Sequence, residues 1–461
     1  MNAFNFSSKS STDIAICFFS LLCVIFAPKN YSYGFCLLMH NLFLLTFAYD
    51  VYKNRKEGVL SFNLLFSVSL YFTSFFYPVF IYNTSERYFS MFDYRFDETL
   101  ISYGTAVVYM AYCFLQLGLN NKQKQIRIIQ KMNVSQISLK KSLKILSVLF
   151  TILLFYFILN DGLSYFSDQF IYSSTSDDKV MGYFIQLITP ISYTLLFLAF
   201  NLQSKNGFCF YYAVCIVGFY AVAILSTGSR TIPLSLILLL FFLYNDKIKR
   251  IGIIKLGILG IFFIALMSLV GALRGNGDLI SVANISENTT DVLKDKSENY
   301  FSFANELIIC NRNLYYLISS TQTVGYTFGM TLLGSFLGMV PFLRSIFMSI
   351  TGIPEYYLNS PLYNTVLSTG IFYTKGLGTH AVADVYICWG ILGVILVFYL
   401  YGFFISKIKE RKDNYYYSVA YYVILSNAIY ACRASIFNLN QIIWTIAIVY
   451  LVLKISKKKS Y

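Results

Sequence analysis

Charged residues are scarce in this sequence. They make up 13% of its 461 residues, while hydrophobic residues make up 57% and the mean hydropathy is +0.60. An average globular protein has about 25% charged and about 45–50% apolar residues, so the composition excludes an ordinary soluble domain. Many stretches of roughly 18 or more nearly uncharged residues indicate instead an all-α polytopic membrane protein.

Patterns for metal or disulfide chemistry are also missing. Eight of the nine cysteines lie in apolar runs, no C-x-x-C motif with partner histidines occurs, and the sequence has only two histidines. These features argue against a zinc site and against a disulfide framework. The adjacent acids Asp177 and Asp178 lack a D-x-D spacing, so we expect no metal site and no other cofactor. The first apolar run has no small-residue cleavage site, and we expect it to remain as a span.

Twelve apolar runs predict about twelve transmembrane helices. They cover residues 12–28, 31–50, 59–82, 99–118, 143–160, 181–203, 207–226, 228–244, 253–273, 384–405, 415–432 and 440–455. An even number places both termini on one side of the membrane, and the segments on that side hold 24 of the 36 lysines and arginines. The positive-inside rule makes that side cytoplasmic. The net charge of +14 therefore reflects the orientation of the chain in the membrane and does not indicate nucleic-acid binding.

The one extended polar stretch, residues 274–383, divides the chain. We expect it to form a large periplasmic loop between a bundle of spans 1–9 (residues 1–273) and spans 10–12 with a basic tail (residues 384–461). Inside the loop, the apolar run Thr323–Leu343 is broken by four glycines and a proline. A thirteenth span there would place the basic segment after span 10 outside, so the run predicts a re-entrant or interfacial helix.

Arg230 is the strongest candidate for an anion-binding residue. It lies in the string T-G-S-R-T-I-P between spans seven and eight, and the 14 residues after it are apolar. That length covers ~21 Å of a ~30 Å hydrocarbon core, which draws Arg230 to the outer edge. Ser229 and the neighbouring backbone N–H groups suit a phosphate. The alternative is an arginine that snorkels to lipid headgroups.

Three further arginines are candidates for the same ligand. Arg274 ends span nine, Arg433 lies in the outer turn between spans eleven and twelve, and Arg312 lies in the large loop. A guanidinium offers a fixed fork of donors that fits a diphosphate better than an ammonium does. The alternative for each of these arginines is an ordinary charged residue at the membrane boundary.

His380 is the only histidine on the predicted outer side, in the string G-L-G-T-H-A-V-A-D. Imidazole is suited to accept a proton near neutral pH, so His380 is a candidate general base. Asp384 follows one helical turn later and would orient it. The alternative is a loop histidine bound to a backbone carbonyl, with Asp384 as an ordinary acid at a helix N-terminus. His40, inside span two, is expected to be a packed and hydrogen-bonded core residue.

The chain resembles Wzy-type O-antigen polymerases, the oligosaccharide repeat unit polymerases. The similar features are about twelve spans with a late outer loop, the G-S-R string at Arg230, and G-x-G-T-H-x-x-A-[DE]-x-Y followed by G-x-x-G over Gly376–Gly393. R-x10-G motifs found in some members are absent, because Arg312 is followed by Gly325 and Arg344 by Gly352.

This resemblance implies a metal-independent glycosyltransferase of the GT-C type in the bacterial inner membrane. Its substrates would be oligosaccharides linked to undecaprenyl diphosphate, joined at the periplasmic face, with Arg230 on the diphosphate and His380 beside the acceptor hydroxyl. A chain-length regulator protein is a further candidate partner. The alternatives are an O-antigen ligase, with similar topology, and a lipid-linked oligosaccharide flippase or transporter. A transporter should show charges at mid-membrane and related halves, and no internal repeat is visible.

Overall fold

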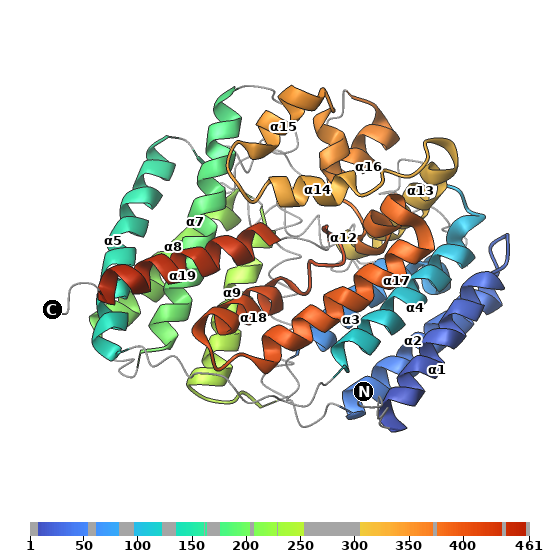
Figure 1. The fold of residues 1–461 in the computed structure, drawn as a ribbon, viewed down its shortest axis with the longest axis horizontal. Coiled ribbons are helices and arrows are strands. Elements are labelled where there is room, and N and C mark those ends of the chain that lie inside the picture. Colours follow the sequence, from blue (N-terminus) through green and yellow to red (C-terminus); the bar gives the residue numbers. More distant parts are fainter. Residues whose placement is uncertain are drawn as a thin grey trace, which may run out of the picture. The chain divides into compact units, whose positions relative to one another are not determined.

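Long apolar helices dominate the structure. The computed structural model describes residues 8–53, 61–82, 96–121, 135–160, 162–163, 176–202, 207–227, 229–252, 305–371, 376–435 and 439–457. Within these ranges, seven helical segments are long and apolar enough to cross a membrane. They are α2 (Tyr33–Lys53), α3 with its continuation through η2 and η3 (Phe62–Ile81), α4 (Leu100–Leu119), α5 (Gln136–Leu159), α7 (Ser176–Phe200), α8 (Phe208–Ser226) and α17 (Ala381–Glu410), all shown in Figure 1. The predicted class, a polytopic α-helical membrane protein, is confirmed.

Shorter helices coincide with the other predicted spans. They are α1 (Ser8–Ile25), α9 (Thr231–Lys247), α18 (Tyr415–Asn427) and α19 (Leu439–Lys457). The predicted ninth span, residues 253–273, lies outside the described residues. The count of twelve spans and the side on which the termini lie therefore stay predictions.

The chain divides into two compact units. The first contains Met1–Gln130, Glu306–Ile424 and Ala428–Leu439, and the second contains Lys131–Asn305, Leu425–Asn427 and Asn440–Tyr461. The predicted boundaries at residues 273 and 383 follow membrane topology, which is a different criterion from contact density, and they stay predictions.

The core of the first unit is the pair α4 and α17. A Cβ on Gly118 would lie 2.2 Å from the carbonyl oxygen of Tyr399, and one on Gly402 would lie 2.3 Å from that of Leu115. The two backbones touch at these glycines, which is how small residues let membrane helices associate. This contact fixes α17, the helix that carries the predicted motif.

Interhelical hydrogen bonds join the helices of the second unit. The Tyr193 hydroxyl on α7 donates to Ser235 Oγ on α9 at 2.6 Å, and the Thr151 and Tyr212 hydroxyls link α5 to α8 at 2.7 Å. Ser142 Oγ on α5 donates to the carbonyl of Val452 on α19 at 3.3 Å. Apolar surfaces alone give no strong preference for helix pairing in lipid, so these polar pairs help to fix the arrangement.

From Glu306 onward, the described part of the large loop forms short helices within the first unit. They are α13 (Cys310–Thr323), α14 (Met330–Leu337), α15 (Leu343–Thr351), η6 (Glu355–Leu358) and α16 (Ser360–Thr369). The apolar run Thr323–Leu343 forms no spanning helix, because α14 has eight residues and covers only ~12 Å. Gly329 precedes α14 as its N-cap residue at φ 85°, a left-handed conformation that favours glycine, and Gly338 is the C-cap residue at its end.

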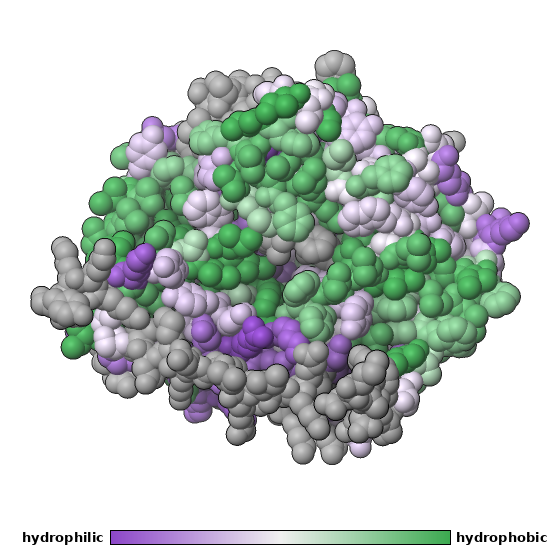
Figure 2. Space-filling model, in the orientation of Figure 1, coloured by the Kyte–Doolittle hydropathy of each residue, from purple (hydrophilic) through white to green (hydrophobic). Residues whose placement is uncertain are grey.

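The last part of this loop carries an exposed apolar surface. None of the α15 residues is buried, and Leu343, Ile346 and Ile350 are exposed. Figure 2 shows hydrophobic side chains gathered over α15. This exposed apolar face begins where the run Thr323–Leu343 ends, and the interfacial or re-entrant position expected for that run stays a prediction.

Candidate functional site

The segment Gly376–His380 leads into α17 and is held by side chains from α13 and α16. Asn313 Nδ2 donates to the carbonyl of Leu377 at 2.8 Å, and Asn364 Nδ2 donates to that of Gly378 at 2.9 Å. The hydroxyls of Thr379 and Ser360 lie 2.7 Å apart. Gly378 has φ 72°, so glycine is needed for this backbone path. The motif string is therefore a clamped loop at the entrance of a helix.

His380 is the N-cap of α17. Its Nδ1 accepts a hydrogen bond from the backbone N–H of Val382 at 3.2 Å, and its Nε2 lies 2.9 Å from Ser74 Oγ. Because Nδ1 is an acceptor in this arrangement, the neutral ring carries its proton on Nε2 and donates it to Ser74. Complete burial lowers the pKa of His380 from 6.5 to about 3. The imidazole is therefore neutral throughout the physiological range, with both nitrogens engaged.

Asp384 lies one turn further along α17 and is also completely buried. Its Oδ1 accepts from the Thr331 hydroxyl of α14 at 3.0 Å, and its Oδ2 accepts from the Ser435 hydroxyl at 2.7 Å. The expected hydrogen bond between this carboxylate and the imidazole of His380 is not formed, since both side chains are bonded elsewhere. The Ser360 hydroxyl is a further hydrogen-bond partner of this carboxylate.

Ser74 owes its position to an irregular helix. The third span widens into the π-helical turns η2 (Tyr71–Phe75) and η3 (Tyr77–Ile81), and Pro78 supplies no backbone N–H there. Such π-turns are frequent at functional sites because they re-aim side chains.

Arg312 is buried at the start of α13, and its guanidinium carbon lies 5.5 Å from the ring centroid of Tyr316. Its neighbours on both sides are anchors: Asn313 binds the motif loop, and Asn311 Nδ2 donates to the carbonyl of Phe72 at 3.1 Å. Arg312 thus lies between two anchoring amides, one bound to the motif loop and one bound to the π-helical part of the third span.

Arg433 lies in the turn after α18, and this turn pairs with the motif. The backbone N–H of Thr379 donates to the carbonyl of Arg433 at 3.4 Å, and that of Ala381 donates to the carbonyl of Cys432 at 3.0 Å. His380, Asp384, Arg312 and Arg433 therefore belong to one unit of the structure. Arg344 lies apart on α15, where its Nη2 donates to the carbonyl of Glu355 at 3.1 Å.

Arg230 and Ser229 belong to the second unit. Arg230 is the N-cap residue of α9, and its carbonyl accepts the N–H of Leu234 at 3.0 Å. It stands at the beginning of a helix, where the backbone dipole favours an anion, as the sequence pattern predicts. Gly228, which precedes Ser229 in the string T-G-S-R, and the candidate Arg274 lie outside the described residues.

The helix α17 is interrupted below the motif. Trp389 has φ −146° and ψ 18°, and Gly390 has φ 61° and ψ −150°. The loop before α14 compensates for the break, because both the N–H and the hydroxyl of Thr327 donate to the freed carbonyl of Ile387, at 2.8 Å and 3.3 Å. Irregular backbone at a membrane boundary is tolerated where protein groups satisfy it in this way.

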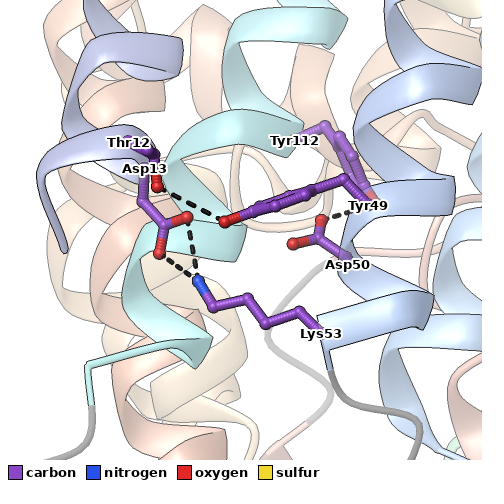
Figure 3. A network of polar contacts seen from close by, with 6 residues as sticks. All are labelled: Thr12, Asp13, Tyr49, Asp50, Lys53 and Tyr112. Carbon is purple, nitrogen blue, oxygen red and sulfur yellow. Dashed lines mark hydrogen bonds and ion pairs between the residues drawn. The ribbon is translucent and has the colours of Figure 1, made fainter. Parts of the chain in front are cut away.

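A second polar network joins α1, α2 and α4 in the first unit (Figure 3). Lys53 Nζ lies 2.7 Å from an Asp13 oxygen, and the Tyr112 hydroxyl donates to the buried Asp50 at 3.3 Å. Charged groups inside helices need such partners. Their place near the start of α1 and the end of α2 puts them on the predicted cytoplasmic side, so we assign them to helix packing.

His40 is buried in α2, and its Nε2 lies 3.2 Å from the Tyr71 hydroxyl. This confirms the predicted core histidine. Among the residues that the structure describes, no group of three or more His, Cys, Asp or Glu side chains could hold a metal ion.

The sequence did not predict the hydrogen-bond partners of His380 and Asp384. Ser74, Thr331 and Ser435 lie 306, 53 and 51 residues from the groups they bind. Single hydroxyls in apolar or loop sequence give no signal of such distant pairing. Asn311 and Asn313 flank Arg312 in the string C-N-R-N-L, and this density of amides was the one usable indication.

Comparison with known proteins gives one match. A family model described as O-antigen polysaccharide polymerase Wzy matches residues 12–460, which is nearly the whole chain. No curated protein and no solved structure matches the chain significantly.

Proposed function

Since the chain belongs to the O-antigen polysaccharide polymerase Wzy family, we propose that it joins repeat units linked to undecaprenyl diphosphate at the outer face of the inner membrane. The match over residues 12–460 carries this assignment, and it favours neither a ligase nor a transporter. Polymerisation of O-antigen repeat units in a membrane is the activity of the family. The carrier, the face of the membrane and the chemistry below are our proposal.

The reaction we propose is a metal-independent glycosyl transfer. The hydroxyl oxygen of one lipid-linked repeat unit attacks the anomeric carbon of the growing chain. The bond from that carbon to the diphosphate breaks, and undecaprenyl diphosphate leaves with the electron pair. Because the leaving group is already a good one, the protein must mainly orient two substrates and stabilise the diphosphate charge.

We assign the diphosphate to the arginines Arg230, Arg274, Arg312 and Arg433, with the hydroxyl of Ser229. What supports Arg230 is its place at the N-terminus of α9. What supports Arg312 and Arg433 is that both are connected to the motif loop through neighbouring residues or their own backbone. Guanidinium groups supply fixed donors for the charge that develops on the leaving diphosphate.

We assign the acceptor side to the motif on α17, with His380 and Asp384 in different roles. Asp384 accepts the proton of the attacking hydroxyl when that hydroxyl takes the place of Ser435, because the buried carboxylate binds hydroxyl donors at 3.0 Å and 2.7 Å. The Ser435 hydroxyl, which is partly exposed, stands where a sugar hydroxyl would donate. His380 is a positioning residue that caps α17 and binds Ser74.

Deleting the gene tests the function. Without a polymerase, the lipopolysaccharide should carry a single repeat unit on the lipid A–core, and long chains should be lost. Restoring the gene should restore the ladder on a gel. Loss of all glycan from the lipid A–core with accumulation of long lipid-linked chains would instead identify a ligase. The same loss with accumulation of single lipid-linked units only would indicate a transporter.

A further inference from the structure

We propose that Trp389 and Tyr326 form a binding surface for a sugar ring of the repeat unit, at the break in α17. This inference rests on the proposed function and adds residues to its substrate site. Trp389 is one of only two tryptophans in the chain. Its side chain is 45% exposed, and that of Tyr326 is 43% exposed.

The backbone is strained where it presents Trp389. Gly390 has φ 61° and ψ −150°, a conformation that is practically restricted to glycine. The break leaves the carbonyl of Ile387 without its helical partner, and Thr327 must satisfy it. The helix is broken where it carries Trp389, and a residue from a separate loop satisfies the backbone carbonyl that the break exposes. This arrangement indicates that the position of Trp389 has a function.

Three glycines leave room for the two rings. A Cβ on Gly329 would lie 2.5 Å from the Trp389 ring, and one on Gly393 would lie 2.7 Å from Trp389 Cβ. A Cβ on Gly390 would lie 3.1 Å from the Tyr326 hydroxyl. The G-x-x-G string of the motif therefore serves to seat these aromatic side chains.

Further tyrosine hydroxyls lie beside this surface. The ring of Tyr326 lies 6.4 Å from that of Tyr386, and the Tyr386 hydroxyl lies 3.1 Å from that of Tyr103 on α4. Exposed aromatic faces offer apolar contact to the C–H side of a sugar ring, and nearby hydroxyls can exchange hydrogen bonds with its O–H groups. The combination suits a carbohydrate.

The surface also lies at a suitable depth. Counting about 20 residues back from Lys407, which is the length of a membrane crossing, reaches Ile387. Trp389 thus lies within the outer part of the predicted span 384–405, about five residues from its outer end. It follows Asp384 by five residues, which is ~7.5 Å along a helix, so a sugar held there is near the acceptor side of the reaction.

Anchoring in lipid is the competing explanation, since tryptophan and tyrosine are enriched at membrane interfaces. Anchoring requires neither a broken helix nor three glycines around the rings. The two explanations also differ in what can replace Trp389. In detergent, where no bilayer is present, anchoring makes no contribution, whereas only an aromatic ring would stack on a sugar.

The first test compares substitutions at one position. Trp389→Leu should lower the kcat/KM for repeat-unit addition about tenfold, and Trp389→Phe should retain most of it. Leu392→Ala, on the same helix and 78% exposed, is the matched control and should leave the rate unchanged. Equal activity of the Leu and Phe variants, at equal folded yield in detergent, would overturn the inference.

The second test keeps Trp389 in place. A Trp444→Phe protein has Trp389 as its only tryptophan, so its fluorescence reports on that ring. Lipid-linked repeat units extracted from the deletion strain should shift the emission, and undecaprenyl diphosphate without sugar should not. Equal shifts, or no shift, from the two probes would refute sugar binding. If this protein still elongates chains in that case, the proposed function stands and only the inference fails.

Discussion

Replacing Arg230 with alanine is expected to reduce chain elongation about 100-fold, the usual cost of removing one donor to charge that develops in a transition state. The physical reason is the loss of a guanidinium fork at the N-terminus of α9, where a departing diphosphate needs compensating charge. The measurement is the lipopolysaccharide ladder of a complemented deletion strain, at matched protein level. Single repeat units on the lipid A–core should replace long chains.

Two further variants define the Arg230 result. Arg230→Lys keeps the charge without the fork and should recover only part of the activity. Arg250→Ala removes an exposed arginine beyond the other end of α9 and should leave the ladder unchanged. A normal ladder from the Arg230→Ala protein would show that Arg230 does not bind the diphosphate. The remaining explanation would be that its side chain extends to the lipid headgroups.

The motif on α17 is expected to give the second large effect. Asp384→Asn should lower elongation by about 100-fold or more, because an amide cannot take the proton of the acceptor hydroxyl. His380→Ala should also impair elongation, since it removes the cap of α17 and the partner of Ser74. His380→Asn should keep much of the activity, because asparagine is a good N-cap. Asp413→Asn, exposed in a loop of the same unit, is the control.

Comparing His380→Ala with His380→Asn shows whether His380 acts as the N-cap of α17 or as the general base. If both variants lose elongation equally, His380 is the base that the sequence pattern indicates, and the assignment of Asp384 to that role is wrong. If the asparagine variant is active, the imidazole itself takes no proton. The measurement is the elongation rate of each purified variant in detergent, and the quantity compared is the ratio of the two rates.

The pH dependence of stability gives an independent check on His380. Burial lowers the pKa of His380 to about 3, against 6.5 for an exposed imidazole. Between these values the unfolded chain binds a proton that the folded chain does not, so stability rises with pH. The contribution is complete above about pH 6.5 and is lost as the pH falls toward 3. The His380→Asn protein should lack this part of the acid destabilisation in thermal unfolding.

The membrane class and most helix positions were predictable because both depend on local composition. Apolar runs of spanning length mark helices such as α4 and α8 to within a few residues. The predicted run Thr323–Leu343 was also recognisable as a non-spanning segment, because its glycines interrupt any long helix. For the candidate site, the strings around Arg230 and His380 predicted that both residues lie where a helix begins, and the structure places both as N-cap residues.

The internal arrangement of the site could not be predicted. A spacing of four residues placed His380 and Asp384 on one face, but it carried no information on Thr331, Ser435 or Ser74, which compete for their hydrogen bonds. Those partners come from distant segments that only the fold brings together. The break at Gly390 was hidden for the same reason, since its stability depends on Thr327 from another part of the chain.

Reconstitution of the purified chain tests the central claim most directly. The protein is placed in liposomes with undecaprenyl-diphosphate-linked repeat units and EDTA, and the products are separated by length. We predict a ladder of lipid-linked oligomers, with one undecaprenyl diphosphate released for each bond formed. No elongation by a folded protein, or elongation that stops when EDTA is added, would contradict metal-independent polymerisation by this chain.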